Sequence, residues 1–202
     1  MDALELFLRE HASVHSSQVA EGEQRSIEDA ILRRLEEEHL RARPQGLNSI
    51  LWLLWHMARA EDVGINVILA ARPQVLDAGG WTDRLGVTVR DVGTGMTGDD
   101  VADLSIRADI AAVRAYRVAV GRNTREVVSA LPAAEWLREP AAGVRERIEA
   151  QGALRPEAQW LYRFWEGKSK AWFISWMGVG HNCFHLGQAS WVRKLLLGKG
   201  QG

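Results

Sequence analysis

The chain has 202 residues, of which 47% are hydrophobic and 25% charged, a balance typical of a globular protein that buries its core without disulfides. Its formal net charge of −1 provides no basic field to attract nucleic acid or an anionic membrane. No apolar run reaches the roughly 18 residues that a membrane span requires. We therefore expect neither nucleic acid nor a membrane among its partners.

The cysteine count and the N-terminal sequence both bear on the compartment. Cys183 is the single cysteine and cannot form a disulfide within the chain, which favours a reducing cytosol. The first residues, MDALELFLREHAS, place acidic side chains where a signal peptide needs an unbroken apolar run. We expect a cytoplasmic protein that folds as a single domain over residues 1–202.

Helical periodicity dominates the chain. Apolar residues recur at helical spacing in five segments, which begin at a capping residue or end before a proline: residues 2–20, 26–43, 49–71, 99–130 and 157–197. We expect the last segment to break near Gly167 or Gly178. No segment alternates with period two for long enough to be a convincing strand. The pattern predicts an all-α protein, a four-helix bundle.

Two long connections depart from a compact bundle. Residues 72–99 contain six glycines and no sustained period, and loops of this length are often lids or binding loops. We predict a mobile lid here, with Trp81 as its anchor over a pocket. Residues 132–156 form the second connection, which carries a short amphipathic helix at residues 144–150.

Three histidines stand where they could hold one metal ion. His56 lies in LLWHMARAED, and the pair His181 and His185 lies in GVGHNCFHLGQ. Positions i and i+4 share a face of an α-helix, so the pair can bind one ion together, with His56 as a third ligand from another helix. Three imidazoles suit zinc, nickel, copper or ferrous iron and leave coordination positions open for water or substrate.

The helical faces of these histidines are apolar. At about 100° per residue, His56 shares a face with Leu53 and Val63, and His181 shares one with Met177 and His185. A buried imidazole needs partners for both ring nitrogens, and a metal ion can satisfy the acceptor nitrogen. Polar neighbours can then accept from the N–H group, and Asn182 and Gln188 are the candidates.

Other readings of the histidines remain open. A single core histidine is more often hydrogen-bonded to a carbonyl group than bound to metal. His11 and His15 form a second HxxxH pair, and His11 could approach the site as a fourth ligand or a substrate contact. The sequence Glu36-x-x-His39 resembles half of a di-iron motif, but no second copy is present, and we interpret it as a solvated face.

These residues together resemble the DinB-like superfamily. The resemblance rests on GLNSILWLLWHMARAED at 46–62, on HNCFHLGQASWVRKLL at 181–196, and on the order of the helices. It implies a four-helix bundle, often dimeric, with a divalent metal ion, most commonly zinc or nickel, on His56, His181 and His185. Characterised members of the superfamily include thiol-dependent isomerases and transferases that join low-molecular-weight thiols to electrophiles.

The resemblance implies a metal-dependent enzyme of small molecules, most simply a thiol-dependent S-transferase or isomerase. A metal-dependent hydrolase is one alternative, and a non-catalytic metal-binding protein of stress response or interaction is another. The expected polar contacts for a substrate are His11, Arg59, Gln188 and Arg84. Cys183 lies about 160° around its helix from His181, so we expect a packed core cysteine rather than the reacting thiol.

The same helical geometry predicts a homodimer. Trp165, Trp172 and Trp176 fall on the side of the last helix opposite His181. The 49–71 helix repeats this pattern, because apolar residues also occupy the side opposite His56: Leu51, Leu54, Met57, Ile65 and Ile68. A four-helix bundle buries one face of each helix, so the second apolar face should meet a partner. The alternative is that residues 21–45 and 132–156 cover these faces.

Overall fold

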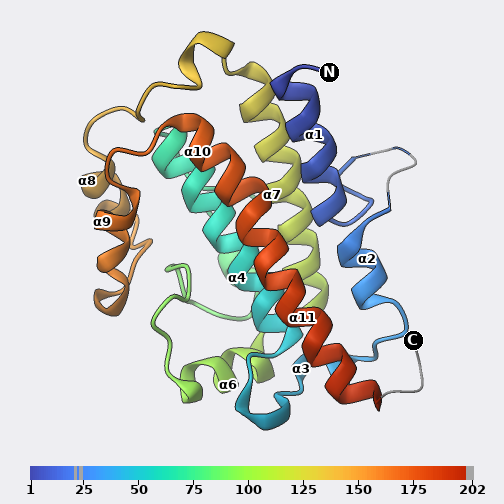
Figure 1. Ribbon diagram of the computed structural model, residues 1–202. Helices are drawn as coiled ribbons and strands as arrows, with labels where there is room; N and C mark the ends of the chain where they lie inside the picture. Colours follow the sequence, from blue (N-terminus) through green and yellow to red (C-terminus); the bar gives the residue numbers. More distant parts are fainter. Residues whose placement is uncertain (21, 23–24, 199–202) are drawn as a thin grey trace.

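A computed structural model describes residues 1–20, 22 and 25–198 of the chain. Figure 1 shows the long helices side by side, with shorter helices around them. The long helical segments are α1 (Ala3–Val14), α4 (Ile50–Asp62) continued by the π-helix η2 (Val63–Leu69), α7 (Ile110–Ala130), and α10 (Lys170–Ser175) continued through the π-helix η6 (Trp176–Gly180) into α11 (His181–Leu197). The described ranges contain no strand, and the all-α prediction is confirmed.

The shorter helices lie in the connections. They are α2 (Ile27–Leu32), α3 (Glu37–Arg41), η1 (Pro44–Gly46), η3 (Val75–Asp77), α5 (Trp81–Arg84), α6 (Gly98–Arg107), η4 (Ala133–Glu135), α8 (Val144–Ala150), η5 (Pro156–Ala158) and α9 (Trp160–Trp165). The helix α8 confirms the amphipathic helix predicted at residues 144–150. No helix in the described residues is long and apolar enough to cross a membrane.

The helix α4 lies at the centre of the molecule. Every residue from 50 to 69 is buried, as expected for a helix that is hydrophobic all round. It packs against α7 and α11, while α3, α6 and α8 cover the remaining sides of α4 and η2. The side that we predicted to meet a partner is therefore filled within the chain: Leu51, Leu54, Met57, Ile65 and Ile68 are all fully buried. We assumed that a four-helix bundle buries only one face of each helix. That assumption is wrong for α4, because the short helices form a second layer around it.

Two glycines set how closely the central helices approach. A side chain on Gly64 of η2 would meet Met177 Cγ at 2.4 Å, and one on Gly178 would meet the Phe7 ring at 2.9 Å. Met177 therefore packs directly on the backbone of η2, and α1 packs directly on the backbone of η6. These contacts fix the position of the last helix along the axis of α4, just before His181 and His185.

Several predicted helix boundaries differ from the observed ones. The 99–130 segment is two helices, because the Asp109 side chain accepts from the backbone N–H of Ala112 and starts α7 afresh. The 26–43 segment divides near Arg34, which has a left-handed φ of 64°. In the last segment Gly167 (φ 68°) ends the first piece as predicted. Gly178 does not break the helix but lies in the π turn, and π turns inside helices often mark functional sites.

The 72–99 connection is largely packed against the core. Leu76, Leu85 and Val92 are buried, and short helices occupy part of the segment. Trp81 is buried against Tyr116, with ring centroids 5.5 Å apart, and the Arg84 guanidinium lies over its outer face. Trp81 does not line the histidine pocket described below, so its predicted place over that pocket is wrong.

Candidate metal centre

The structure brings His56, His181 and His185 together. One nitrogen from each imidazole lies within 4.8 Å of the others. His56 comes from the middle of α4, while His181 and His185 open α11 one turn apart, directly after the π turn of η6. The spacing inferred from the sequence therefore corresponds to one cluster in space.

Hydrogen bonds fix the orientation of two of the three rings. The Nδ1 atom of His56 lies 2.5 Å from the Val92 carbonyl oxygen, and Nδ1 of His185 lies 2.8 Å from Oε1 of Gln188. Because both oxygen atoms accept, each Nδ1 carries the proton and each Nε2 presents a lone pair. Trp52 stacks on the His56 ring at 4.7 Å and 9°, which holds its plane.

His181 completes the set. Its Nε2 lies 3.1 Å from Nε2 of His185, while its buried Nδ1 has no hydrogen-bond partner. A single proton can join the two Nε2 atoms, but it leaves Nδ1 of His181 as an unsatisfied acceptor. A cation bound to the Nε2 lone pairs would move that proton to Nδ1, the arrangement that metal-ligating histidines adopt.

The environment keeps all three rings neutral, as metal ligation requires. Burial lowers the pKa of His56 to about 3, with a further contribution from the charge of His185. Burial, and then the charges of His56 and His185, hold the pKa of His181 well below its usual value. The pKa of His185 is also lowered by burial, although the hydrogen bond to Gln188 opposes the shift. Neutral imidazoles therefore face one another at physiological pH.

A cavity of about 410 Å³ has His56, His181 and His185 in its wall. Residues 93–96, near the end of the long connection, form part of the wall. Most of the other lining side chains are large and apolar: Trp52, Met96, Val101, Trp160, Leu161, Phe164 and Trp176. The polar lining side chains besides the histidines are Asn48 and Thr94, so the lining contains no carboxylate or lysine among the described residues.

The remaining predicted contacts lie elsewhere, apart from Gln188. Gln188 supports His185 from outside the cavity, which confirms its predicted contact but not a place in the pocket. Arg59 is buried beside Tyr116 and Asp62 and donates to Gln74 and to the Arg90 carbonyl group. The expectation that Arg59 contacts substrate is wrong, because these partners use its guanidinium inside the core.

His11, Arg84 and Cys183 also differ from expectation. His11 faces inward as predicted but joins His15 and Glu61 in a separate buried cluster. Arg84 lies on Trp81, away from the histidine cavity. Cys183 is exposed rather than packed in the core, because no part of the described chain covers it on the outer side of α11. The solvated face predicted for Glu36-x-x-His39 is confirmed, because Glu36 is exposed and the motif forms the capping box of α3.

Sequence reasoning missed the aromatic wall of the cavity. Trp52 lies one turn before His56 on α4, so the i, i+4 spacing could have placed it on the ring. Trp160 and Phe164 come from α9, whose position against the histidines depends on the turn at Gly167. No local pattern reveals that contact.

The comparisons with known proteins agree with this fold. A family model of the DinB superfamily matches residues 23–189, and the chain belongs to that superfamily. The fold is similar to a solved structure described as a conserved protein of Enterococcus faecalis, with a TM-score of 0.69 and 16% identity over 98% of this chain and 99% of that chain. At that identity the likeness establishes the fold alone. No curated protein matches the chain.

Proposed function

We propose that this protein is a metal-dependent enzyme of small molecules, with zinc or nickel on His56, His181 and His185. The observation that carries the proposal is the convergence of three neutral imidazoles in the wall of an aromatic cavity. The DinB superfamily and this histidine group support metal binding. The reaction that we propose is a thiol-dependent S-transfer or isomerisation with a low-molecular-weight thiol as cosubstrate.

The residues of the chain have two tasks in such a reaction. Val92 and Gln188 hold the N–H groups of two imidazoles, so that the Nε2 lone pairs point to one place. The tryptophan and phenylalanine side chains of the cavity exclude water and offer flat apolar surfaces to an electrophile. When bound, a divalent ion lowers the pKa of a coordinated thiol and presents the thiolate near neutral pH.

The lining of the cavity favours a thiol reaction over hydrolysis. Metal-dependent hydrolases commonly use a carboxylate as general base, whereas the described cavity offers only imidazole, amide and hydroxyl groups besides its apolar residues. A thiol cosubstrate brings its own nucleophile, so such a base is not required. The exposed Cys183 is outside the lining, so the nucleophile would come from a separate molecule.

The first experiment measures metal and is followed by a thiol assay. Protein purified without a histidine tag or chelator should contain metal that His181→Ala strongly reduces and His39→Ala does not. The metal-loaded protein should then either consume glutathione, cysteine or another small thiol with 1-chloro-2,4-dinitrobenzene, which releases chloride, or isomerise maleylpyruvate only when the thiol is present, since the thiol adds and is then released unchanged.

Each outcome distinguishes the candidate functions. Metal binding with thiol consumption or thiol-dependent isomerisation that His181→Ala abolishes supports the proposal. Metal binding with hydrolysis of p-nitrophenyl esters but no thiol-dependent reaction would favour the hydrolase. Metal binding without either activity would favour a non-catalytic metal-binding protein. Protein that takes up no metal at His56, His181 and His185 after reconstitution would contradict the site.

We also propose that the protein works as a homodimer in the cytoplasm. Trp165 is buried within the chain, and the half-buried Trp172 and Trp176 pack against Phe164, so the tryptophans first expected at an interface are largely used internally. Exposed apolar side chains remain on α11, where Phe184 and Trp191 are 60% and 58% exposed. A second copy would remove these rings from water.

A further inference from the structure

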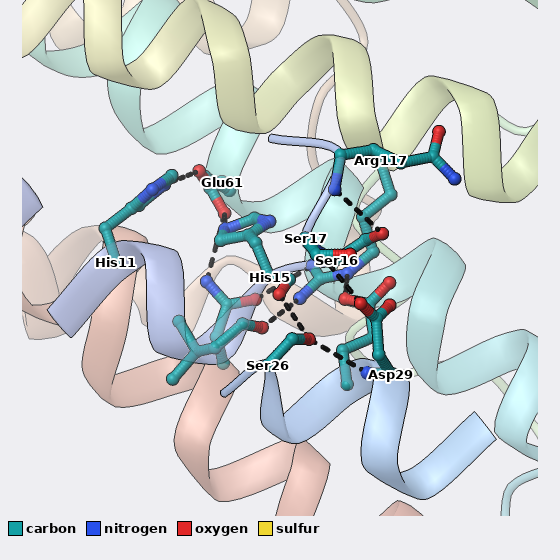
Figure 2. A network of polar contacts seen from close by, with 12 residues as sticks. His11, His15, Ser16, Ser17, Ser26, Asp29, Glu61 and Arg117 are labelled. Carbon is teal, nitrogen blue, oxygen red and sulfur yellow. Dashed lines mark hydrogen bonds and ion pairs between the residues drawn. The ribbon is translucent and has the colours of Figure 1, made fainter. Parts of the chain in front are cut away.

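A second cluster of metal-ligating side chains lies in the interior, apart from the histidine cavity. His11 lies in the last turn of α1 and His15 is the C-cap of that helix, and Glu61 faces both from α4 (Figure 2). All three side chains are fully buried. The Nε2 atom of His11 lies 3.0 Å from Oε1 of Glu61, and Nε2 of His15 lies 2.9 Å from Oε2.

The hydrogen bonding of this cluster is incomplete. Nε2 of His15 is close to the carboxylate but is not aligned for a hydrogen bond, and Nδ1 of both histidines also has no partner. The two rings stack, with centroids 4.2 Å apart, so both present their Nε2 atoms to the same carboxylate. Buried polar atoms without partners are rare and call for an explanation such as an ion.

The charges around Glu61 do not balance. Arg117 is a buried cation of the same network, and its Nε donates to Glu28 at 2.5 Å. Its other nitrogens donate to Asn182 and to the Val14 carbonyl group, as part of the network in Figure 2. Glu61 itself accepts from the neutral amide of Asn182. Among the described residues, this carboxylate therefore remains without a paired arginine or lysine in a fully buried place, and such a charge is costly unless it is compensated.

Two species could supply the missing positive charge, a proton or a metal ion. A proton shared with His11 satisfies one nitrogen–oxygen contact but leaves the misaligned contact at His15. A metal ion needs lone pairs rather than aligned N–H groups, and the cluster provides two imidazole nitrogens and two carboxylate oxygens. Four such donors are sufficient for closed coordination of zinc.

We propose that His11, His15 and Glu61 form a second, structural site for a divalent transition metal ion such as zinc. Because the ligands are fully buried, no substrate reaches this site, and the ion would fasten α1 to α4. The proposal is independent of the catalytic role of the histidine cavity. It predicts two ions per chain, of which only one depends on His181.

The test counts ions in variants that separate the two sites. Untagged protein is reconstituted with zinc, freed of excess metal, and measured by native mass spectrometry and elemental analysis. We expect two ions in the wild type, one in His181→Ala, one in Glu61→Gln, and none in the double variant. Glu61→Gln keeps the shape and a hydrogen-bonding oxygen, and circular dichroism establishes that it is folded.

A second measurement reports on the ligands directly. In the His181→Ala background, cobalt(II) titration should give a visible spectrum of a four-coordinate nitrogen and oxygen site, and Glu61→Gln should abolish it. A His181→Ala protein that is folded yet binds no ion would overturn the second site and leave the first intact. One ion that is lost in Glu61→Gln but kept in His181→Ala would instead contradict the catalytic site.

Discussion

Acidification should destabilise the metal-free protein over a pH range in which carboxylates contribute little. Burial lowers the pKa of His15 and of His56 from the usual 6.5 to about 3. As pH falls below about 6.5, the unfolded chain binds protons at these positions and the folded chain does not. The stability from the neutral rings is therefore complete above that pH and is lost progressively toward about pH 3.

The size of the effect follows from the two pKa values. Between about pH 7.5 and 5.5, each ring that titrates only in the unfolded chain costs about 1.4 kcal/mol, so His15 and His56 together cost about 2.7 kcal/mol. The lowered pKa of His181 adds a loss of the same sign. For a chain of this size the loss corresponds to a melting temperature lower by roughly 5–10 °C. Glu61 does not oppose it, because its pKa lies well below the usual 4.5. Burial raises that pKa, but the charge of His15 and the hydrogen bond from His11 outweigh burial.

Urea unfolding in excess chelator, followed by circular dichroism at both pH values, measures this loss. The variant His56→Asn retains an amide N–H that can donate to the Val92 carbonyl oxygen but cannot take up a proton. Its pH-dependent loss should be smaller than that of the wild type by about 1.4 kcal/mol. A wild-type loss below about 1 kcal/mol, or an unchanged loss in His56→Asn, would show that the imidazoles are not held neutral by burial.

Three further predictions test other parts of the structure. Gly93→Ala should destabilise the protein by about 1–3 kcal/mol, because φ is 82° and the new methyl would lie 2.6 Å from a tryptophan ring; Gly187→Ala, which faces open space in a helix, should not. Hydrogen exchange across residues 76–92 should be as slow without ligand as in the helices, which would make this segment a fixed belt, whereas fast exchange that slows with ligand would support the lid. Sedimentation equilibrium at tens of micromolar should show a dimer that dissociates when Phe184 and Trp191 become serine, and a single species near 22.5 kDa in the wild type would contradict it.

The histidine cluster could be predicted because it depends on angles around helices. The spacing of His181 and His185 places them on one face, and the apolar neighbours of His56 place it inward. The angle of a residue around its helix follows from the local sequence. The structure confirms that all three side chains point to the inside of the bundle. The height at which one helix meets another is not local, and here it depends on Met177 against Gly64 and on the π turn of η6.

His11 shows the consequence of that missing information. Its inward direction is predicted correctly, yet it lies beside Glu61 and His15 rather than beside His56, His181 and His185. A helical wheel cannot distinguish these two places, since both are interior. The exposure of Cys183 has a related cause, because the outer side of α11 is covered only where another segment crosses it. A helical wheel predicts the side of the helix on which a residue lies, but not where another segment packs across that side.

The surroundings of the polar residues on α4 could not be predicted from the sequence pattern. In a surface helix the run Arg59 to Asp62 would mark the solvated face, but α4 is enclosed on all sides. Its polar side chains must therefore have interior partners. Asp62 accepts from Tyr116 and from backbone N–H groups at residues 75 and 76, which attaches the long connection to the core.

Neighbouring residues on α4 and α11 connect the two histidine clusters. Glu61 follows His56 by five positions on α4, about 140° around the helix, and Asn182 follows His181 directly on α11. Asn182 donates to Glu61 and to the carbonyl groups of Met177 and Gly178, in the π turn that precedes the histidine pair. Glu61 is thus linked through one amide to the turn that positions His181. The same amide therefore orients the carboxylate and satisfies two carbonyl groups of the π turn, although each cluster keeps its own ligands.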